Sequence, residues 1–403
     1  MFNWGLKIRG LRPIGLDIGH HSIKMIQLAI NGDQIAVLAA DEARVNAGID
    51  GDSEERRRSV ISAIKRMLAE GNFHGRDVVS CLPNDRLKMT SLRLPETETA
   101  QIEQALRKEA RQRFGLDPAK DVINYMLAGS VRQGDEIKNE LILFATDDET
   151  IRSHIAMLQE AQLRPVAIDA IPCALFRTFE RSLRRQEDKE RTVVFVDIGS
   201  RCATVVFGRG SEICFVKQVA LGEERLNREI AARLGISINE VQMLRGRLRM
   251  EKGLPSPWSG ATEGACDGNI QQLDAPTRQV IINAISTVAE ELAREISLCF
   301  RYYTVTFRGK RVDRAIFSGG EAYENILLDV LRQQLKVEIE VAQPLRGFDM
   351  RNVKFSGFKQ DLLCEWAVAV GLSLKGCNGN TSGQKTPQTQ ESAFANGNSY
   401  ERN

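Results

Sequence analysis

A strand-rich pattern occurs twice in this chain, at positions about 180 residues apart. Residues 13–45 have the composition of a strand, an Asp-Ile-Gly loop, a second strand, a tight turn and a third strand. Residues 192–222 repeat that order, including the Asp-Ile-Gly loop. A supersecondary unit that recurs at this distance indicates duplication of a half domain. The sequence therefore predicts an α/β protein built from two related lobes.

The remaining segments are assigned around this repeat. Residues 13–83 and 166–185 are predicted to form the first lobe, and residues 190–375 the second. Residues 84–165 are predicted to be an inserted α+β subdomain, with an amphipathic helix over 98–114, strands over 121–127 and 140–145, and a helix over 150–161. The short charge run 184–191 is predicted to join the lobes.

Three segments lack the apolar periodicity of a folded element. Residues 1–12 are predicted to be a flexible leader, with an extra edge strand as the alternative. Residues 251–276 are predicted to form a mobile loop within the second lobe. Residues 376–403 are polar and of low complexity, which predicts a disordered tail.

Composition excludes several classes of function. Lys and Arg number 55 against 53 Asp and Glu, so the formal charge of +2 gives no case for nucleic-acid binding. The eight cysteines form no C-x-x-C pair and only four histidines are present, so neither a zinc site nor a disulfide framework is expected. The apolar runs fall short of the ~18 residues that span a bilayer. We therefore expect a cytoplasmic protein that reaches a membrane only indirectly.

The repeated loops have the residue types of a phosphate site. Gly19 lets the backbone approach a phosphate closely, and Asp17 is suited to hold a hydrated Mg²⁺. Lys24 adds a cation. A single Asp-x-Gly is more often a turn, but Asp197 and Gly199 duplicate it, so two hairpin loops are predicted to hold one polyphosphate.

A third Gly-rich turn, at Gly319 and Gly320, follows a strand. This order of motifs resembles the superfamily of actin, heat-shock proteins and sugar kinases, whose first phosphate loop is D-x-G-x-x-x-x-K. The resemblance implies an actin-like (ribonuclease H-like) duplicated two-lobe fold with an inserted α+β subdomain. It also implies that ATP and Mg are the cofactors, with an adenosine motif at the third turn.

A closer resemblance extends over 14–375. The phrases CLPNDRLKMTSLRLP, KEARQRF, VAIDAIPCALFR, ALGEERLNREIA, REISLCFRYY and AVAVGLSLK occur in the order typical of the PilM family of type IV pilus assembly proteins. The resemblance implies an ATP-binding cytoplasmic scaffold, peripheral to the inner membrane, that couples its partner to cytoplasmic pilus components. The partner is PilN, whose cytoplasmic N-terminal segment docks between the first lobe and the insert.

Other partners and other families stay open. Pilus motor ATPases, and a homo-oligomer or ring, are further partners compatible with the family. One alternative is an actin-like ATPase, filament or membrane tether of the FtsA type. Another is the cytoplasmic component of a type II secretion-like system, related to GspL.

Site residues are carried over from the resemblance position by position. Asp17 and Asp197 are the expected metal-binding residues, acting through water. His20 and His21 replace the usual small Ser residues of the first loop, while Gln242 and Arg245 replace a ribose-binding A-E-x-x-K motif. The full expected ATP-binding set is Asp17, Gly19, His20, His21, Ser22, Lys24, Asp197, Gly199, Thr204, Gly222, Gln242, Arg245, Gly319, Gly320 and Glu321.

Catalytic residues are not determined by the sequence. Asp17, Asp169 and Asp197 are weak candidates, and Asp169 is the only carboxylate at the strand-to-helix connection where relatives orient the attacking water. A structural role for Asp169 is favoured. We therefore expect ATP binding with slow or absent hydrolysis. Arg56, Arg57 and Arg58 are expected to be the solvated face of a helix.

Overall fold

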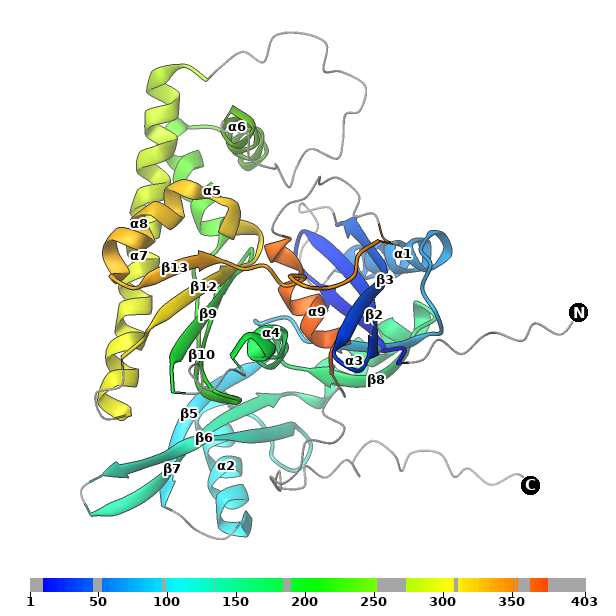
Figure 1. Ribbon diagram of the computed structural model, residues 1–403, viewed down its shortest axis with the longest axis vertical. Helices are drawn as coiled ribbons and strands as arrows, with labels where there is room; N and C mark the ends of the chain where they lie inside the picture. The colour runs from blue at the N-terminus through cyan, green and yellow to red at the C-terminus, as the bar shows by residue number, and fades with distance from the viewer. Residues whose placement is uncertain are drawn as a thin grey trace, which may run out of the picture.

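The structure is a computed structural model (Figure 1) that describes residues 10–45, 53–95, 99–133, 135–183, 190–251, 273–307, 311–351, 353 and 363–375. The predicted disordered tail, 376–403, lies outside these ranges, as do residues 1–9 of the leader and 252–272 of the predicted mobile loop. Of the leader, Leu11 forms an antiparallel bridge with Ala29. None of the helices in the described ranges is both long and apolar enough to cross a membrane.

The first sheet contains the first copy of the repeat. Its strands are β1 (Ile14–Ile18), β2 (Ser22–Asn31), β3 (Gln34–Arg44), β4 (Asp77–Cys81) and β8 (Arg164–Asp169), in the order β3-β2-β1-β4-β8. The first three strands are antiparallel, whereas β4 and β8 run parallel to β1. Helix α1 (Glu54–Glu70) is capped by Ser53 and packs its apolar side on this sheet.

The second sheet repeats the topology of the first. Its strands are β9 (Thr192–Ile198), β10 (Ala203–Arg209), β11 (Glu212–Val219), β12 (Arg314–Ser318) and β13 (Glu338–Val341), in the order β11-β10-β9-β12-β13. Again three antiparallel strands are followed by two parallel ones. The sheet is covered by α5 (Glu223–Leu234), α7 (Ala275–Thr306) and α8 (Asn325–Leu335), while α6 (Ile238–Glu251) packs beside α5. The duplication predicted from the sequence is thus present in both sheets.

The insert is smaller than its predicted bounds. Its antiparallel sheet, β5-β7-β6, consists of β5 (Lys88–Pro95), β6 (Val122–Gln133) and β7 (Glu136–Thr146), with α2 (Thr99–Phe114) packed on it. Strand β5 was not expected. Helix α3 (Asp148–Glu160), which the sequence assigned to the insert, buries Leu158 in the core of the first lobe beside α1. The reason is that its apolar side continues the face formed by β1, β2 and α1.

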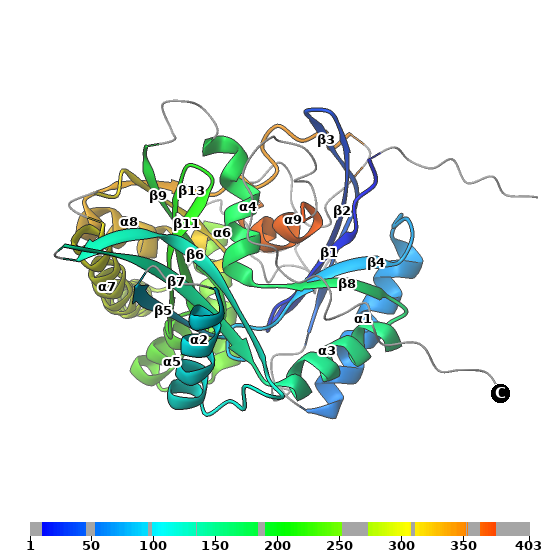
Figure 2. The ribbon, with the colours of Figure 1, turned by 90° about the horizontal axis from the view of Figure 1, so that it is seen from below.

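Two helices cross between the lobes. Helix α4 (Ile171–Glu180) follows the first sheet in sequence, but its Phe176 and Phe179 pack on Phe195 in the second-lobe core. Helix α9 (Ala367–Ser373) follows the second sheet and packs on β1 and β2 of the first. Figure 2 shows both helices between the two sheets. The lobe assignments of α4 and α9 predicted from chain order are therefore exchanged, because each helix covers the other lobe's sheet.

Candidate functional site

The two Asp-Ile-Gly loops fold alike and line one cavity. After β1, the Gly19 N–H donates to the Ser22 carbonyl at 2.9 Å, and after β9 the Gly199 N–H donates to the Cys202 carbonyl at 3.1 Å. A Cβ on Gly19 would lie 2.8 Å from the Ser22 oxygen, so the tight turn needs glycine. The cavity between the loops measures about 560 Å³, within the range of small-molecule sites.

Its walls come from both lobes, the segment 81–86, α4 and α9. The lining residues are Asp17, Ile18, Gly19, His20, Arg56, Cys81, Leu82, Pro83, Asn84, Asp85, Arg86, Ile171, Asp197, Gly199, Ser200, Arg201, Cys202, Gln218, Ala220 and Val368.

The two aspartates lie close enough to influence each other. Burial raises the pKa of Asp17, with Lys24 opposing the shift. Burial, and then the charge of Asp17, raise the pKa of Asp197 to about 6, although the Ser318 hydroxyl donates to Asp197 Oδ1 at 3.1 Å. No group of three or more His, Cys, Asp or Glu side chains suited to a metal occurs in the described ranges. Two carboxylates nonetheless match Mg²⁺, which takes its other ligands from water and phosphate.

Lys24 lies opposite Asp17 in the β1–β2 register but does not line the cavity. Its Nζ lies 2.6 Å from Ser22 Oγ and 3.3 Å from Glu42 Oε1. Burial alone would lower the pKa of Lys24, but the carboxylates of Glu42 and Asp17 outweigh it and raise that pKa. The equivalent position in the second lobe is Thr204, which is fully buried and accepts a hydrogen bond from Asn84 Nδ2 at 2.9 Å. Lys24, Ser22 and Thr204 therefore support the loops from behind.

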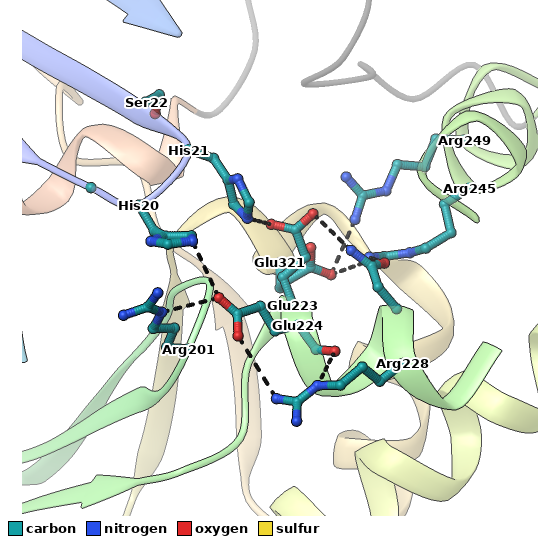
Figure 3. A network of polar contacts seen from close by, with 12 residues as sticks. His20, His21, Ser22, Arg201, Glu223, Glu224, Arg228, Arg245, Arg249 and Glu321 are labelled. Atoms are coloured by element: carbon teal, nitrogen blue, oxygen red, sulfur yellow. Dashed lines mark hydrogen bonds and ion pairs between the residues drawn. The ribbon is translucent and has the colours of Figure 1, made fainter. Parts of the chain in front are cut away.

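The two histidines connect the first loop to the second lobe (Figure 3). His20 Nε2 lies 3.4 Å from Glu224 Oε1, and His21 Nε2 lies 3.5 Å from Glu223 Oε2. Burial lowers the pKa of both histidines, that of His21 to about 4. Burial raises the pKa of Glu223 to about 7. At neutral pH these are thus polar contacts of uncharged imidazoles, and only His20 reaches the cavity wall.

The second loop holds the start of α5. Gly222 precedes this helix, and the N–H groups of Glu223 and Glu224 donate to the carbonyls of Gly199 and Ser200 at 3.1 and 2.9 Å. A Cβ on Gly222 would lie 2.5 Å from the Gly199 oxygen, which explains the glycine. These helix N–H groups are therefore used inside the protein.

The residues expected to hold the nucleoside do not line this cavity. Arg245 donates from Nη1 to Asn227 Oδ1 at 2.7 Å and from Nη2 to Glu321 Oε2 at 2.5 Å, while Arg249 Nη2 lies 3.2 Å from the same Glu321 oxygen. Glu324 completes this buried group, whose members are at most 4 % exposed. Separating such a buried pair costs about 3–5 kcal/mol. Arg245 and Glu321 thus bind each other instead of facing the phosphate loops.

The other adenosine residues also lie away from the cavity. Gln242 is on α6, three residues before Arg245, and is absent from the lining. Gly319, with φ of +88°, packs so closely on β9 that a Cβ would lie 2.4 Å from the Ile198 oxygen. Gly320 begins the short 3₁₀ turn η3 (Gly320–Tyr323), which carries Glu321.

Arg56 is a site residue that the sequence analysis missed. It was expected on a solvated helix face, but it is 8 % exposed, donates from Nη2 to the Gly19 carbonyl at 2.9 Å and lines the cavity. Its Nη1 and the Ser200 hydroxyl are buried without a hydrogen-bond partner among the described residues. The signal was its spacing, since Arg56 precedes the buried Val60 and Ile64 by one and two helical repeats.

A second set of missed residues joins the lobes. Arg201 lies 3.2 Å from Asp85 Oδ2 and 3.1 Å from Glu224 Oε1. Gln218 Nε2 donates to the Asn84 carbonyl at 3.0 Å and to its Oδ1 at 2.9 Å. The segment 81–86 therefore fastens the first lobe to β10 and β11 below the cavity.

Asp169 lies outside the cavity lining. Its Oδ2 accepts from Arg177 Nη1 at 2.8 Å, and its Oδ1 lies 3.3 Å from Lys375 Nζ. The strand-to-helix connection presents apolar Ile171 to the cavity instead. The environment of Asp169 is thus that of a structural ion pair between α4 and the end of α9.

The comparisons with known proteins come to the same fold. A family model described as type IV pilus assembly protein PilM matches residues 15–256 and 278–377. The chain belongs to the PilM family. This match favours the PilM interpretation over the FtsA-type and secretion-type alternatives.

Two solved structures are similar to the whole chain. A PilM–PilN type IV pilus biogenesis complex is similar at a TM-score of 0.69 and 22 % identity, over 91 % of this chain and 98 % of that one. The ethanolamine utilization protein EutJ from Carboxydothermus hydrogenoformans is similar at a TM-score of 0.50 and 12 % identity, over 91 % and 90 %. At these identities the likeness concerns the fold, and it confirms the actin-like two-lobe architecture expected from the sequence.

Proposed function

We propose that this protein is a cytoplasmic scaffold of the inner-membrane complex for type IV pilus assembly. In this role it docks the cytoplasmic N-terminal segment of a PilN-like membrane protein. The observation that carries the proposal is the family match over nearly the whole folded chain. The similarity in fold to a solved PilM–PilN complex supports the choice of partner. Coupling to pilus motor ATPases and a homo-oligomeric ring are predictions from the resemblance alone.

The proposed docking place is the junction of the first lobe and the insert. Strand β8 is an edge strand of the first sheet, and β6 is an edge strand of the insert sheet. An extended peptide can add to such an edge through main-chain hydrogen bonds, with specificity from side-chain contacts. Val166 on β8 is 50 % exposed and offers an apolar contact. Beneath this junction Leu82, Leu87 and Ile151 form a small core.

The cleft fits part of an ATP–Mg complex. Asp17 and Asp197 would hold Mg²⁺ through water, while Arg56 and the loop at Gly199 would contact phosphate oxygens. The nucleoside is not fitted, because Arg245 is paired with Glu321. No carboxylate near Ile171 is free to orient water, since Asp169 is held by two cations. Slow or absent hydrolysis is therefore proposed, with the ligand holding the two lobes together.

The docking proposal is tested by titrating a fluorescent peptide with the purified full-length protein. The peptide is the N-terminal cytoplasmic segment of a PilN encoded in the same genome. Val166→Asp should weaken binding at least about tenfold, because it places a charge on the proposed apolar edge. Ile137→Asp is the matched control, since Ile137 is 54 % exposed and lies on the β6–β7 hairpin of the insert. Equal affinity of the wild type and Val166→Asp would exclude this docking place.

A further inference from the structure

The phosphate side of the cleft contains unused hydrogen-bonding capacity. Arg56 is a buried cation on the cavity wall, and its Nη1 has no hydrogen-bond partner among the described residues. The Ser200 hydroxyl, on the opposite loop, is in the same state and also lines the cavity. A buried guanidinium with an unsatisfied N–H loses solvation without compensation, so this pair is built to contact an oxygen-rich anion.

The same wall carries three carboxylates, those of Asp17, Asp85 and Asp197. A bare anion would be repelled by them, so it must enter together with a divalent cation. Burial raises the pKa of Asp17 and of Asp197, as expected for carboxylates without a counter-ion of sufficient charge. The chemistry of the wall is thus that of a site for a metal-complexed phosphate chain.

The opposite side offers no surface to a base or a ribose. Arg245, Arg249, Glu321 and Glu324 saturate one another and are at most 4 % exposed. Figure 3 shows both arginines extending from α6 toward Glu321, on the far side of the histidines from Arg201. A nucleoside placed between α6 and η3 would have to separate these charges and leave them buried and unpaired.

We propose that the cleft binds the Mg²⁺ complex of a polyphosphate through the phosphate chain alone and does not recognise a base. The ligand is either inorganic polyphosphate or the triphosphate part of any nucleotide. The inference deepens the proposed ligand role of the cleft and is independent of partner docking. If the peptide titration fails, this inference can still hold, and the reverse is also true.

The test is a calorimetric titration of the full-length protein with tripolyphosphate, ATP, GTP and CTP, each with excess Mg²⁺. All four dissociation constants are expected to agree within about fivefold. A preference for ATP of more than about fivefold over tripolyphosphate or GTP overturns the proposal. Failure of all four ligands to bind also overturns it. This series needs no variant, so it does not depend on a substitution being tolerated.

Two variants on one helix test the anion contact. Arg56→Gln removes the buried cation and should weaken all four ligands by a common factor of about ten or more. Arg58→Gln is the control, because Arg58 is exposed on the same helix, and its affinities should equal those of the wild type. Arg56→Lys keeps the charge and should recover part of the affinity. Unchanged affinity in Arg56→Gln overturns the role assigned to Arg56.

Discussion

Replacing Asp197 by Asn should stabilise the ligand-free protein, and the gain should depend on pH. Burial and the charge of Asp17 raise the pKa of Asp197 from 3.8 to about 6. At about 1.4 kcal/mol per pKa unit, ionised Asp197 costs the native state up to about 3 kcal/mol. This is an upper limit, because the side chain borders the cavity.

The sign follows from proton linkage. The native state holds the Asp197 proton more tightly than the unfolded state does, so the favourable contribution is complete below pH 3.8 and is lost as pH rises to about 6. The advantage of Asp197→Asn should therefore be small near pH 4 and reach its full value above pH 6. For a fold of this size the plateau corresponds to a rise in Tm of about 4 °C.

The assay is thermal unfolding of both proteins between pH 4 and pH 8 in the presence of a chelator. Asp147→Asn provides a control of opposite sign, because hydrogen bonds from Thr150 outweigh burial and lower the pKa of Asp147. That carboxylate contributes stability above its unfolded pKa, so the variant should lose stability as pH rises from 3 to 7. A Tm difference between wild type and Asp197→Asn that does not change with pH would refute the reasoning.

Three further predictions concern the metal, the buried ion pairs and the crossing helices. Mg²⁺ should raise the Tm of the wild type at pH 7.5 but much less at pH 5, where Asp197 is protonated, and it should not raise the Tm of Asp197→Asn; equal effects at both pH values would argue against this carboxylate as a ligand. Arg245→Met should destabilise the second lobe by about 3–5 kcal/mol in chemical denaturation, because Glu321 is left buried beside one cation fewer, and an unchanged denaturation midpoint would contradict this. Gly371→Ala should lower the Tm by several degrees, because its Cβ would lie 1.8 Å from the Ala174 oxygen where α9 crosses α4, whereas Gly320→Ala, with no atom within 4 Å of the added Cβ, should not.

Much of the fold could be predicted because the duplication is visible in the sequence. The spacing of Asp17 and Gly19 recurs at Asp197 and Gly199, and the two loops form the same hydrogen-bonded turn. Strand alternation and the turns at 31–33 and 208–210 gave both three-stranded meanders. Local periodicity was sufficient for these elements because each meander is formed by neighbouring segments.

The exchange of α4 and α9 could not be predicted in this way. Both helices are apolar on most sides, and periodicity does not say which of two similar sheets a helix covers. The pairing of Arg245 with Glu321 joins residues far apart in sequence, so each one looked like a ligand contact in isolation. Arg56 was misassigned because charge was given more weight than its position on the apolar side of α1.

The most direct test of the proposed scaffold role is hydrogen exchange of the full-length protein with and without the PilN-like peptide. We predict slower exchange in β8 (Arg164–Asp169) and in the facing edge strand β6, because a docked segment would pair with their free main-chain groups. A scrambled peptide should leave both strands unchanged. Protection confined to other segments, or no protection with saturating peptide, would contradict the account.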